Sequence, residues 1–576
     1  MKTAQNAFYI IMVLACVLAI SFAMVGCNSA QTQDTTAVKE TTSSDLNDEP
    51  PVENVQPEQN WEKGFVAALS LEAQCFDAEG APLGSLTRGT QVEYRKTADG
   101  KTEIRSAGMT GYLQEGAYAV ADAADVVPAH TLYVRTAVNL RDKDGRLLSA
   151  LAEKGKAIAV TGCDYVYPDG KAHMYRVRFD GAEGYIMPYY LVDNEAAALA
   201  NFDNGNYATH AGREDRFGGG GAANLDYYPR EKGPIVGNEM PEECRTLYIA
   251  AWRVGDVDKY IEIANKSGIN AFVVDIADGT SIGYAADVMN QYCPSAAAAP
   301  NNTVAGYKAA ITKLKNAGYY VIGRITTFND SYFIKDHPEY AITNKEGAPL
   351  KLSGEYWPTP YNRTAWQYKV DLAVEAVELM GFHEIQFDYV RFPDSTSKYE
   401  KAGTIDFHNT YGETKVQAIQ RFLMYATDIL HEHGVYVSAD VYGESAYNYV
   451  TAYGQYWPAI SNVVDVISGM PYPDHFAASG TWRPWEHPYQ TLNNWGQSVM
   501  YRQGETATPA VVRTWIQAYN AIREPYNTYG PDEVSAQISG LRDAGCTGGY
   551  MTWNAGASVD KYTSLIPAFK PPKKNG

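Results

Sequence analysis

From Thr246 onward, short apolar segments alternate with longer segments in which apolar residues recur at helical spacing. This alternation is typical of a parallel sheet, because each helix returns the chain to the edge where the next strand begins. Eight strand–helix units predict a (β/α)8 TIM barrel over residues 246–568. A doubly wound open sheet is the alternative, and the lack of a Gly-x-Gly-x-x-Gly loop disfavours it. The predicted strands are 246–252, 271–276, 319–326, 384–390, 436–443, 464–473, 511–519 and 548–555.

Glycine and proline mark the ends of the predicted helices. A Gly just past a helix end adopts the left-handed conformation that closes the last turn. Residues 371–380 carry apolar side chains at the spacing of one helix face. Pro531 stands where a first helical turn would begin. The glycines that precede predicted strands are Gly268, Gly318, Gly381, Gly434 and Gly545.

The N-terminus has the pattern of an export signal. An apolar run from Ala7 to Val25 follows Lys2 and ends in Gly26-Cys27. Small residues before a single Cys resemble a bacterial lipobox. The pattern predicts a lipoprotein signal peptide over 1–27, a lipidated Cys27 and an anchor on the extracellular face of the cell membrane. An ordinary cleaved signal and a transmembrane anchor are the alternatives. Residues 28–60 are polar and predict a disordered stalk.

Residues 61–122 and 126–194 read as two copies of one small unit. Each copy has a Leu-x-x-Leu segment and closes with a Gly-Tyr-aliphatic triplet, at 111–113 and 184–186. The pattern resembles bacterial SH3-like domains, which are small β-barrels that often bind cell-wall peptides. The resemblance implies two all-β domains with a cell-wall peptide as candidate partner, and structural spacers are the alternative. Residues 195–245 are rich in Gly and Pro and predict a flexible linker.

Charge and cysteine usage exclude several classes of function. The formal net charge is −19, which disfavours a nucleic-acid partner because phosphates need a basic surface. No cysteine belongs to a Cys-x-x-Cys pair, so the sequence has no zinc pattern. No spacing of His, Asp and Glu resembles a dedicated metal site. The sequence therefore predicts neither a metal nor a cofactor.

Two acids occupy neighbouring predicted strands where a TIM barrel places its active site, at the C-terminal strand ends. They are Asp388 and Asp440. Glycoside hydrolysis requires a pair of carboxylates, one as acid and one as base or nucleophile. We therefore predict Asp388 as nucleophile or base, with Asp440 or else Glu444 as proton donor. A purely structural Asp388, clamped by Arg391, is the alternative.

Other polar and aromatic residues at the strand ends are predicted to contact substrate. Aromatic faces suit sugar rings, although they also fill cores. An Asp at a strand end often caps the next helix, so this role competes for Asp275. The permanent charge of Arg324 favours orienting acids over reacting, and His475 could instead hold a loop. The predicted substrate-binding residues are Trp252, Asp275, Arg324, Arg391, Tyr472, His475, Gln517, Trp553 and Asn554.

Four blocks carry a family resemblance: 384–393 (EIQFDYVRFP), 438–443, 470–473 with His475, and 552–554. In this order they resemble a family of bacterial glycoside hydrolase-like proteins with a TIM barrel, first catalogued as a domain of unknown function. The resemblance implies hydrolysis of glycosidic bonds, with Asp388 as leading catalytic residue and Asp440 as its partner. We expect an extracellular polysaccharide as substrate. A non-catalytic cell-wall or carbohydrate-binding lipoprotein is the rival hypothesis.

Overall fold

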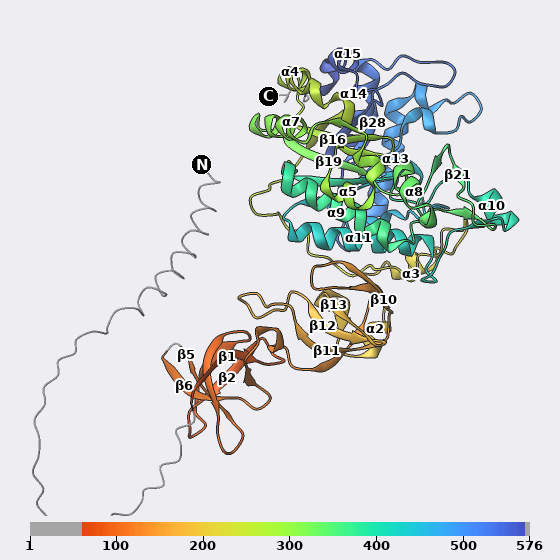
Figure 1. Cartoon of the computed structure of the whole chain (residues 1–576). Coiled ribbons are helices and arrows are strands. Elements are labelled where there is room, and N and C mark those ends of the chain that lie inside the picture. The colour runs from red at the N-terminus through yellow and green to blue at the C-terminus, as the bar shows by residue number, and fades with distance from the viewer. Residues whose placement is uncertain (1–59, 107, 571–576) are drawn as a thin grey trace, which may run out of the picture. The chain divides into compact units, whose positions relative to one another are not determined.

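The computed structural model describes residues 60–106 and 108–570 (Figure 1). The predicted signal peptide with Cys27, and the predicted stalk up to residue 59, lie outside these ranges. Within the ranges, no helix is both long and apolar enough to cross a membrane. The described chain consists of two all-β units followed by an α/β barrel.

The two β units are antiparallel sheets of seven strands with the same topology. The strand order is β3-β2-β6-β5-β4-β1-β7 in the first and β10-β9-β13-β12-β11-β8-β14 in the second, so the two orders coincide when each is counted from its own first strand. This confirms the predicted all-β class and indicates one repeated unit. The first unit contains β1 (Glu62–Ala67), β2 (Glu72–Phe76), β3 (Pro82–Thr87), β4 (Gln91–Lys96), β5 (Thr102–Ser106), β6 (Met109–Leu113) and β7 (Tyr118–Val120). The second contains β8 (His130–Val134), β9 (Val138–Arg141), β10 (Leu147–Ala152), β11 (Ala157–Cys163), β12 (Tyr175–Phe179), β13 (Ala182–Ile186) and β14 (Leu191–Val192).

The barrel has the eight parallel strands that the sequence predicts. They are β15 (Cys244–Ile249), β16 (Ala271–Asp278), β19 (Tyr320–Thr326), β23 (Glu384–Asp388), β25 (Tyr436–Tyr442), β26 (Val466–Met470), the split strand β27 (Val511–Val512) and β28 (Thr514–Gln517), and β29 (Gly549–Trp553). β27 pairs with β26, whereas β28 pairs with β29. The interruption at Arg513 thus lets one strand join both neighbours and close the ring, which confirms the TIM barrel.

Helices follow the strands around the barrel (Figure 1). Gly381 closes α9 with a left-handed φ of 72°, and Pro531 is the first residue of α14, both as predicted. α9 begins earlier than predicted, because Asn362 caps its N-terminus by accepting from the Ala365 amide. The main helices are α4 (Val257–Asn265), α7 (Val304–Asn316), α9 (Arg363–Met380), α11 (Lys415–Glu432), α12 (Trp457–Ser461), α13 (Pro488–Gly504), α14 (Pro531–Asp543) and α15 (Val559–Ser564).

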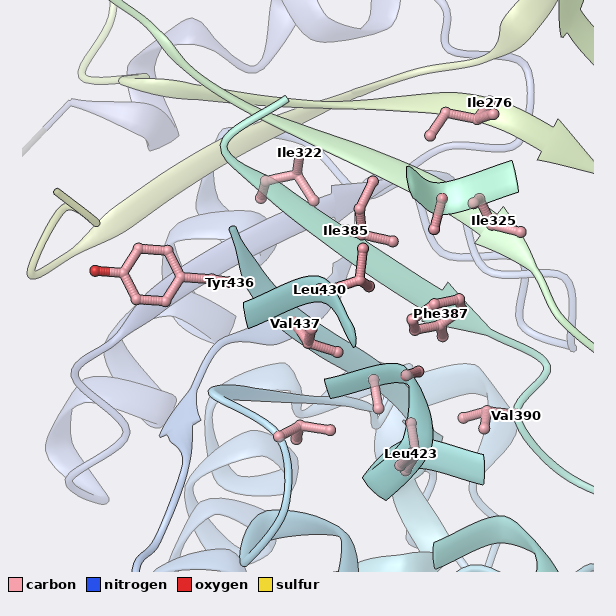
Figure 2. Packing of buried hydrophobic residues seen from close by; sticks show 14 of the residues in the cluster. Ile276, Ile322, Ile325, Ile385, Phe387, Val390, Leu423, Leu430, Tyr436 and Val437 are labelled. Atoms are coloured by element: carbon pink, nitrogen blue, oxygen red, sulfur yellow. The ribbon is translucent and has the colours of Figure 1, made fainter. Parts of the chain in front are cut away.

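The apolar core lies between the strands and the helical layer. Figure 2 shows Ile385 and Phe387 of β23 and Val437 of β25 beside Leu423 and Leu430 of α11, all fully buried. Burying such a side chain stabilises the fold by roughly 1.5–3 kcal/mol. Side chains alternate along a strand. The intervening residues of β23 therefore project into the barrel, and they are polar: Glu384, Gln386 and Asp388.

The segment 195–245 packs against the barrel, whereas the sequence predicted a flexible linker. It contains α2 (Glu195–Leu199) and α3 (Tyr207–Ala211). Leu225 and Tyr227 are buried in a cluster with barrel residues such as Val416 and Tyr456. These few apolar side chains fix the segment in place, although Gly, Pro and charged residues dominate its composition.

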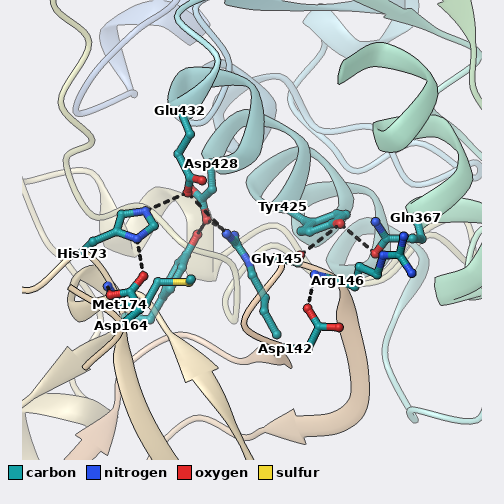
Figure 3. Close-up of polar contacts among 12 residues, drawn as sticks. Asp142, Gly145, Arg146, Asp164, His173, Met174, Gln367, Tyr425, Asp428 and Glu432 are labelled. Carbon is teal, nitrogen blue, oxygen red and sulfur yellow. Dashed lines mark hydrogen bonds and ion pairs between the residues drawn. The ribbon is translucent and has the colours of Figure 1, made fainter. Parts of the chain in front are cut away.

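A buried charge cluster joins the second β unit to α11 (Figure 3). Arg141 Nη2 and Arg230 Nη2 contact opposite oxygens of Asp428, at 2.9 Å and 2.6 Å. The Tyr190 hydroxyl also donates to Asp428, at 2.5 Å. His173 bridges Asp164 of its own unit and Glu432 of α11, at 2.5 Å and 3.1 Å. We call this contact the domain seam.

Candidate active site

A pocket of about 230 Å³ opens at the C-terminal ends of the barrel strands. It is lined by residues from most of the strands and the loops that follow them. This is the edge at which TIM barrels place their active sites. The lining residues are Asp278, Arg324, Asp388, Tyr389, Arg391, Tyr442, Met470, Tyr472, His475, Trp515 and Trp553.

Arg324 lies at the floor of the pocket and is shared among several acids. Its Nη1 contacts Asp275 Oδ1 at 2.6 Å, and its Nη2 contacts Asp388 Oδ2 at 2.5 Å. Its Nε is 3.9 Å from Asp440 Oδ2. Parallel pairing places Arg324 beside Asp275 on one side and Gln386 on the other. One permanent positive charge is thus surrounded by a surplus of carboxyl groups.

Asp388 is the central acid of the pocket wall. Its Oδ2 accepts from Arg324, and its Oδ1 accepts from the backbone amide of Tyr389 at 2.6 Å. Hydrogen bonds to both oxygens therefore fix the orientation of the Asp388 carboxyl group. Tyr389 has a φ of +50°, a left-handed conformation that costs a non-glycine residue roughly 1–2 kcal/mol. This strained turn presents the Tyr389 amide to Asp388 and its ring to the pocket.

Asp440 is next to Asp388 but is fully buried. Its Oδ1 accepts from Trp515 Nε1 at 2.8 Å, and its Oδ2 has no hydrogen-bond partner among the described residues. Burial raises the pKa of Asp440 well above its usual range, and the charge of Asp388 raises it further. Both causes favour the neutral form of Asp440.

Asp275 is also fully buried, on the other side of Arg324. Its second oxygen accepts from the Tyr248 hydroxyl. Burial raises the pKa of Asp275 to about 7, although Arg324 acts in the opposite direction. Asp275 therefore titrates near neutral pH. Because its side chain is buried, it does not line the pocket.

The structure brings most of the predicted site residues together. Six line the pocket: Arg324, Asp388, Arg391, Tyr472, His475 and Trp553. Asp275 and Asp440 lie beneath it, out of solvent. Gln517 and Asn554 are buried and bind backbone carbonyls of the loop after β28, at Tyr519 and Ala518.

The two remaining predicted residues, Trp252 and Glu444, are exposed to solvent and do not line the pocket. Trp252 is half-exposed, in the turn after β15, with the Arg253 guanidinium over its ring. Glu444 is exposed and accepts hydrogen bonds from Tyr449 and Tyr453. Neither contacts Asp388 or Arg324 in the described structure.

Sequence reasoning did not assign a role to several residues of the site. Tyr248 and Trp515 bind the two buried acids, and Asp278, Tyr389 and Tyr442 line the pocket. Trp515 could have been found from the alternation of side chains along its strand, because it lies two residues before Gln517 and therefore points to the same, inward face. The described residues contain no group of three or more His, Cys, Asp or Glu that could hold a metal ion.

A family model described as "Putative glycosyl hydrolase domain" matches residues 246–559, which is more than half of the chain. The chain belongs to this glycosyl hydrolase family. The match includes residues of all eight strands and every residue of the pocket lining. It confirms the family resemblance and the predicted enzyme class. None of the curated proteins matches the chain.

Solved structures similar to this glycosyl hydrolase include three of bacterial origin. A hypothetical protein from Ruminiclostridium thermocellum is 32% identical, over 34% of this chain and 97% of that one, with a TM-score of 0.29. The glycoside hydrolase domain of PgaB (BpsB) from Bordetella bronchiseptica is 15% identical, over 56% and 99%, with a TM-score of 0.40. The chitobiase of Flavobacterium johnsoniae is 12% identical, over 57% and 48%, with a TM-score of 0.37.

Proposed function

We propose that this glycosyl hydrolase cleaves an extracellular polysaccharide in the pocket around Asp388. The observation that carries the proposal is a carboxylate held by Arg324 and the Tyr389 amide in the wall of a pocket lined by aromatic rings. An anion fixed beside a sugar ring can attack or stabilise the positive charge that develops at the anomeric carbon. Trp553, Tyr472 and Tyr389 offer faces on which a sugar ring can stack.

Asp440 acts on this chemistry through Asp388. We predicted Asp440 as the proton donor, but its carboxyl group has no surface that a substrate could touch. Burial and the charge of Asp388 both raise the pKa of Asp440, which favours a neutral side chain beneath Asp388. We therefore assign Asp440 as a positioning residue, which affects the substrate only through its neighbours Asp388 and Arg324.

A row of aromatic side chains leads from the pocket to the surface and supports a polymeric substrate. Tyr442 lines the pocket, where its hydroxyl accepts from Arg391, and its ring contacts Tyr453 at 5.0 Å. Glu444 joins Tyr453 to Tyr449. Phe217, from the segment before the barrel, packs on Tyr449 at 4.8 Å and is half-exposed. Tyr453 is itself buried, so Tyr442, Tyr449 and Phe217 are the rings of this row on which sugar units beyond the pocket could stack.

A polysaccharide panel tests the proposed activity. The purified protein should release reducing ends from at least one bacterial wall polysaccharide or exopolysaccharide. Asp388→Asn, which keeps the side-chain shape, should lower this release by about a thousandfold or more, while Tyr501→Ala at an exposed position of α13 should leave it unchanged. Binding of wall material without turnover by the wild type would instead favour a carbohydrate-binding lipoprotein.

We also propose that a lipid on Cys27 holds the enzyme on the extracellular face of the cell membrane. The two β units are candidate binding sites for cell-wall peptides. The support is the sequence pattern of the first 27 residues and the SH3-like repeat. Labelled palmitate should be incorporated by the wild type and not by Cys27→Ser. Equal labelling of the two would refute the anchor.

A further inference from the structure

The four acids around Arg324 differ in their access to the pocket. The side chains of Asp275 and Asp440 are 1% and 0% exposed, and that of Asp388 is 8% exposed. The side chain of Asp278 is 35% exposed. A group that gives a proton to the substrate must touch it and must regain a proton from water in every cycle. Of these acids, only Asp278 combines contact with the pocket and ready access to water.

The hydrogen bonds of the two pocket acids also differ. Both oxygens of Asp388 accept from strong donors, so a proton on Asp388 would displace an ion pair. Within residues 60–106 and 108–570, Asp278 Oδ1 accepts a single hydrogen bond, from the Thr326 hydroxyl at 3.0 Å. Arg324 Nη1 is 3.8 Å from the same oxygen, beyond hydrogen-bond distance. Asp278 can therefore bind and release a proton without breaking a direct contact with Arg324.

A backbone irregularity turns Asp278 toward the pocket. The parallel pairing of β16 with β19 shifts between Asp275 and Ala277, which is a bulge. With strict alternation, Asp278 would point to the face opposite Asp275. Bulges redirect side chains and are common beside active sites. Here the bulge lets both acids of one strand approach Arg324, one below the pocket and one at its wall.

We propose that Asp278 is the residue that exchanges a proton with the glycosidic oxygen, opposite Asp388 at the anomeric carbon. The assignment rests on the proposed glycosidase function. Asp278 gives its proton to the glycosidic oxygen as the carbon–oxygen bond breaks, and the bonding electrons leave with that oxygen. Water then adds its oxygen to the anomeric carbon and releases one proton. This proton replaces the one that Asp278 gave up, so Asp278 and Asp388 together return to their starting protonation. The net reaction consumes one water per bond cleaved.

The decisive test compares Asp278→Asn with the matched control Ser281→Ala. Ser281 pairs with Asp278 in the same hairpin but binds Asn301 outside the pocket. On the polysaccharide identified by the panel, Asp278→Asn should lower kcat about 10²- to 10⁴-fold, and Ser281→Ala should not. On a 2,4-dinitrophenyl glycoside of the same sugar, the loss should be at least tenfold smaller, because this leaving group needs no proton.

The possible outcomes distinguish a failure of the Asp278 assignment from a failure of the proposed glycosidase function. A wild type that hydrolyses no polysaccharide overturns both. An active wild type with an inactive Asp388→Asn and a fully active Asp278→Asn overturns only the role of Asp278. Equal losses on the two substrates, with a lowered melting temperature, would show a structural role. A second variant, Thr326→Val, removes the hydroxyl that donates to Asp278 and leaves the Asp278 carboxyl group in place. It should shift one limb of the pH–rate profile with little loss of activity at the optimum.

Discussion

The pocket and the domain seam are buried charge clusters of opposite design. In the pocket, one arginine, Arg324, is shared by Asp275 and Asp388, with two more acids within 4 Å. In the seam, one acid, Asp428, is shared by Arg141 and Arg230. Both side-chain oxygens of Asp428 have a partner, and the unpartnered seam atoms among the described residues are on the cations, at Arg141 Nη1 and Arg230 Nη1. Beneath the pocket the unpartnered atom is an acid oxygen, Asp440 Oδ2.

The difference shows how one kind of interaction serves two purposes. A buried acid whose two oxygens bind cations from different parts of the chain fixes those parts together. A surplus of acids around one cation cannot all be ionised, so some retain protons near neutral pH. The seam is therefore suited to joining domains, and the pocket to acid–base chemistry.

The largest effect is expected when the central charge of the pocket is removed. Arg324→Gln leaves the acids of the pocket without their cation, so we expect loss of hydrolysis and a fall in barrel stability of about 3–5 kcal/mol. Thermal melting and release of reducing ends measure the two effects. A variant that melts with the wild type would show that the acids are neutralised in another way.

The corresponding change in the seam should affect stability without affecting chemistry. Asp428→Asn leaves Arg141 and Arg230 buried without their shared anion, at a cost of about 3 kcal/mol. Glu432, 3.9 Å from Arg141 Nη1, should limit the loss. Limited proteolysis between the β unit and the barrel should accelerate, while kcat on the polysaccharide stays within twofold. A large fall in kcat would contradict the separation of the two clusters.

The stability of the pocket and that of the seam should depend on pH over different ranges, because their buried groups have different pKa values. The pKa of Asp275 is raised to about 7, so the stability that it contributes is complete below about pH 4 and is lost as the pH rises to 7. Asp275→Asn removes this dependence. Its melting temperature relative to the wild type should therefore rise between pH 4 and pH 8. A constant difference over this range would argue against a titrating Asp275.

The smallest effect is expected at His173 in the seam. Burial alone would lower its pKa, but hydrogen bonds to Asp164 and Glu432 outweigh burial and raise the pKa to about 9. The stability from this contact is complete below about pH 6.5 and is lost as the pH rises through 9. His173→Gln should cost about 1.5 kcal/mol at pH 6 and little at pH 10. Denaturant titrations at the two pH values measure the difference.

The barrel was predictable because its signals are local and repeated. Apolar strands, closing glycines such as Gly381 and the N-terminal Pro531 each reflect backbone geometry that a short window reveals. Strand ends also located Asp388 and Arg324, since a TIM barrel gathers its functional residues at one edge.

Depth and irregular backbone were not predictable. Parity places Asp440 on the inner face of its strand, but its complete burial depends on Trp515, 75 residues further along the chain. The strand predicted over 271–276 extends to Asp278, and its bulge redirects that side chain. Likewise, composition concealed the packing of Tyr227, because a few long-range contacts outweigh many flexible residues.

The packed segment before the barrel has a consequence for the size of the catalytic module. Arg230 supplies half of the cations at Asp428, and Lys232 donates to the carbonyls of Ser461 and Thr508 inside the barrel's helical layer. Phe217 extends the aromatic row from the same segment. A protein that began at Cys244 would retain every barrel strand yet expose the apolar patch around Val416 and Tyr456 to water. The smallest autonomous enzyme in this chain therefore begins well upstream of its first barrel strand.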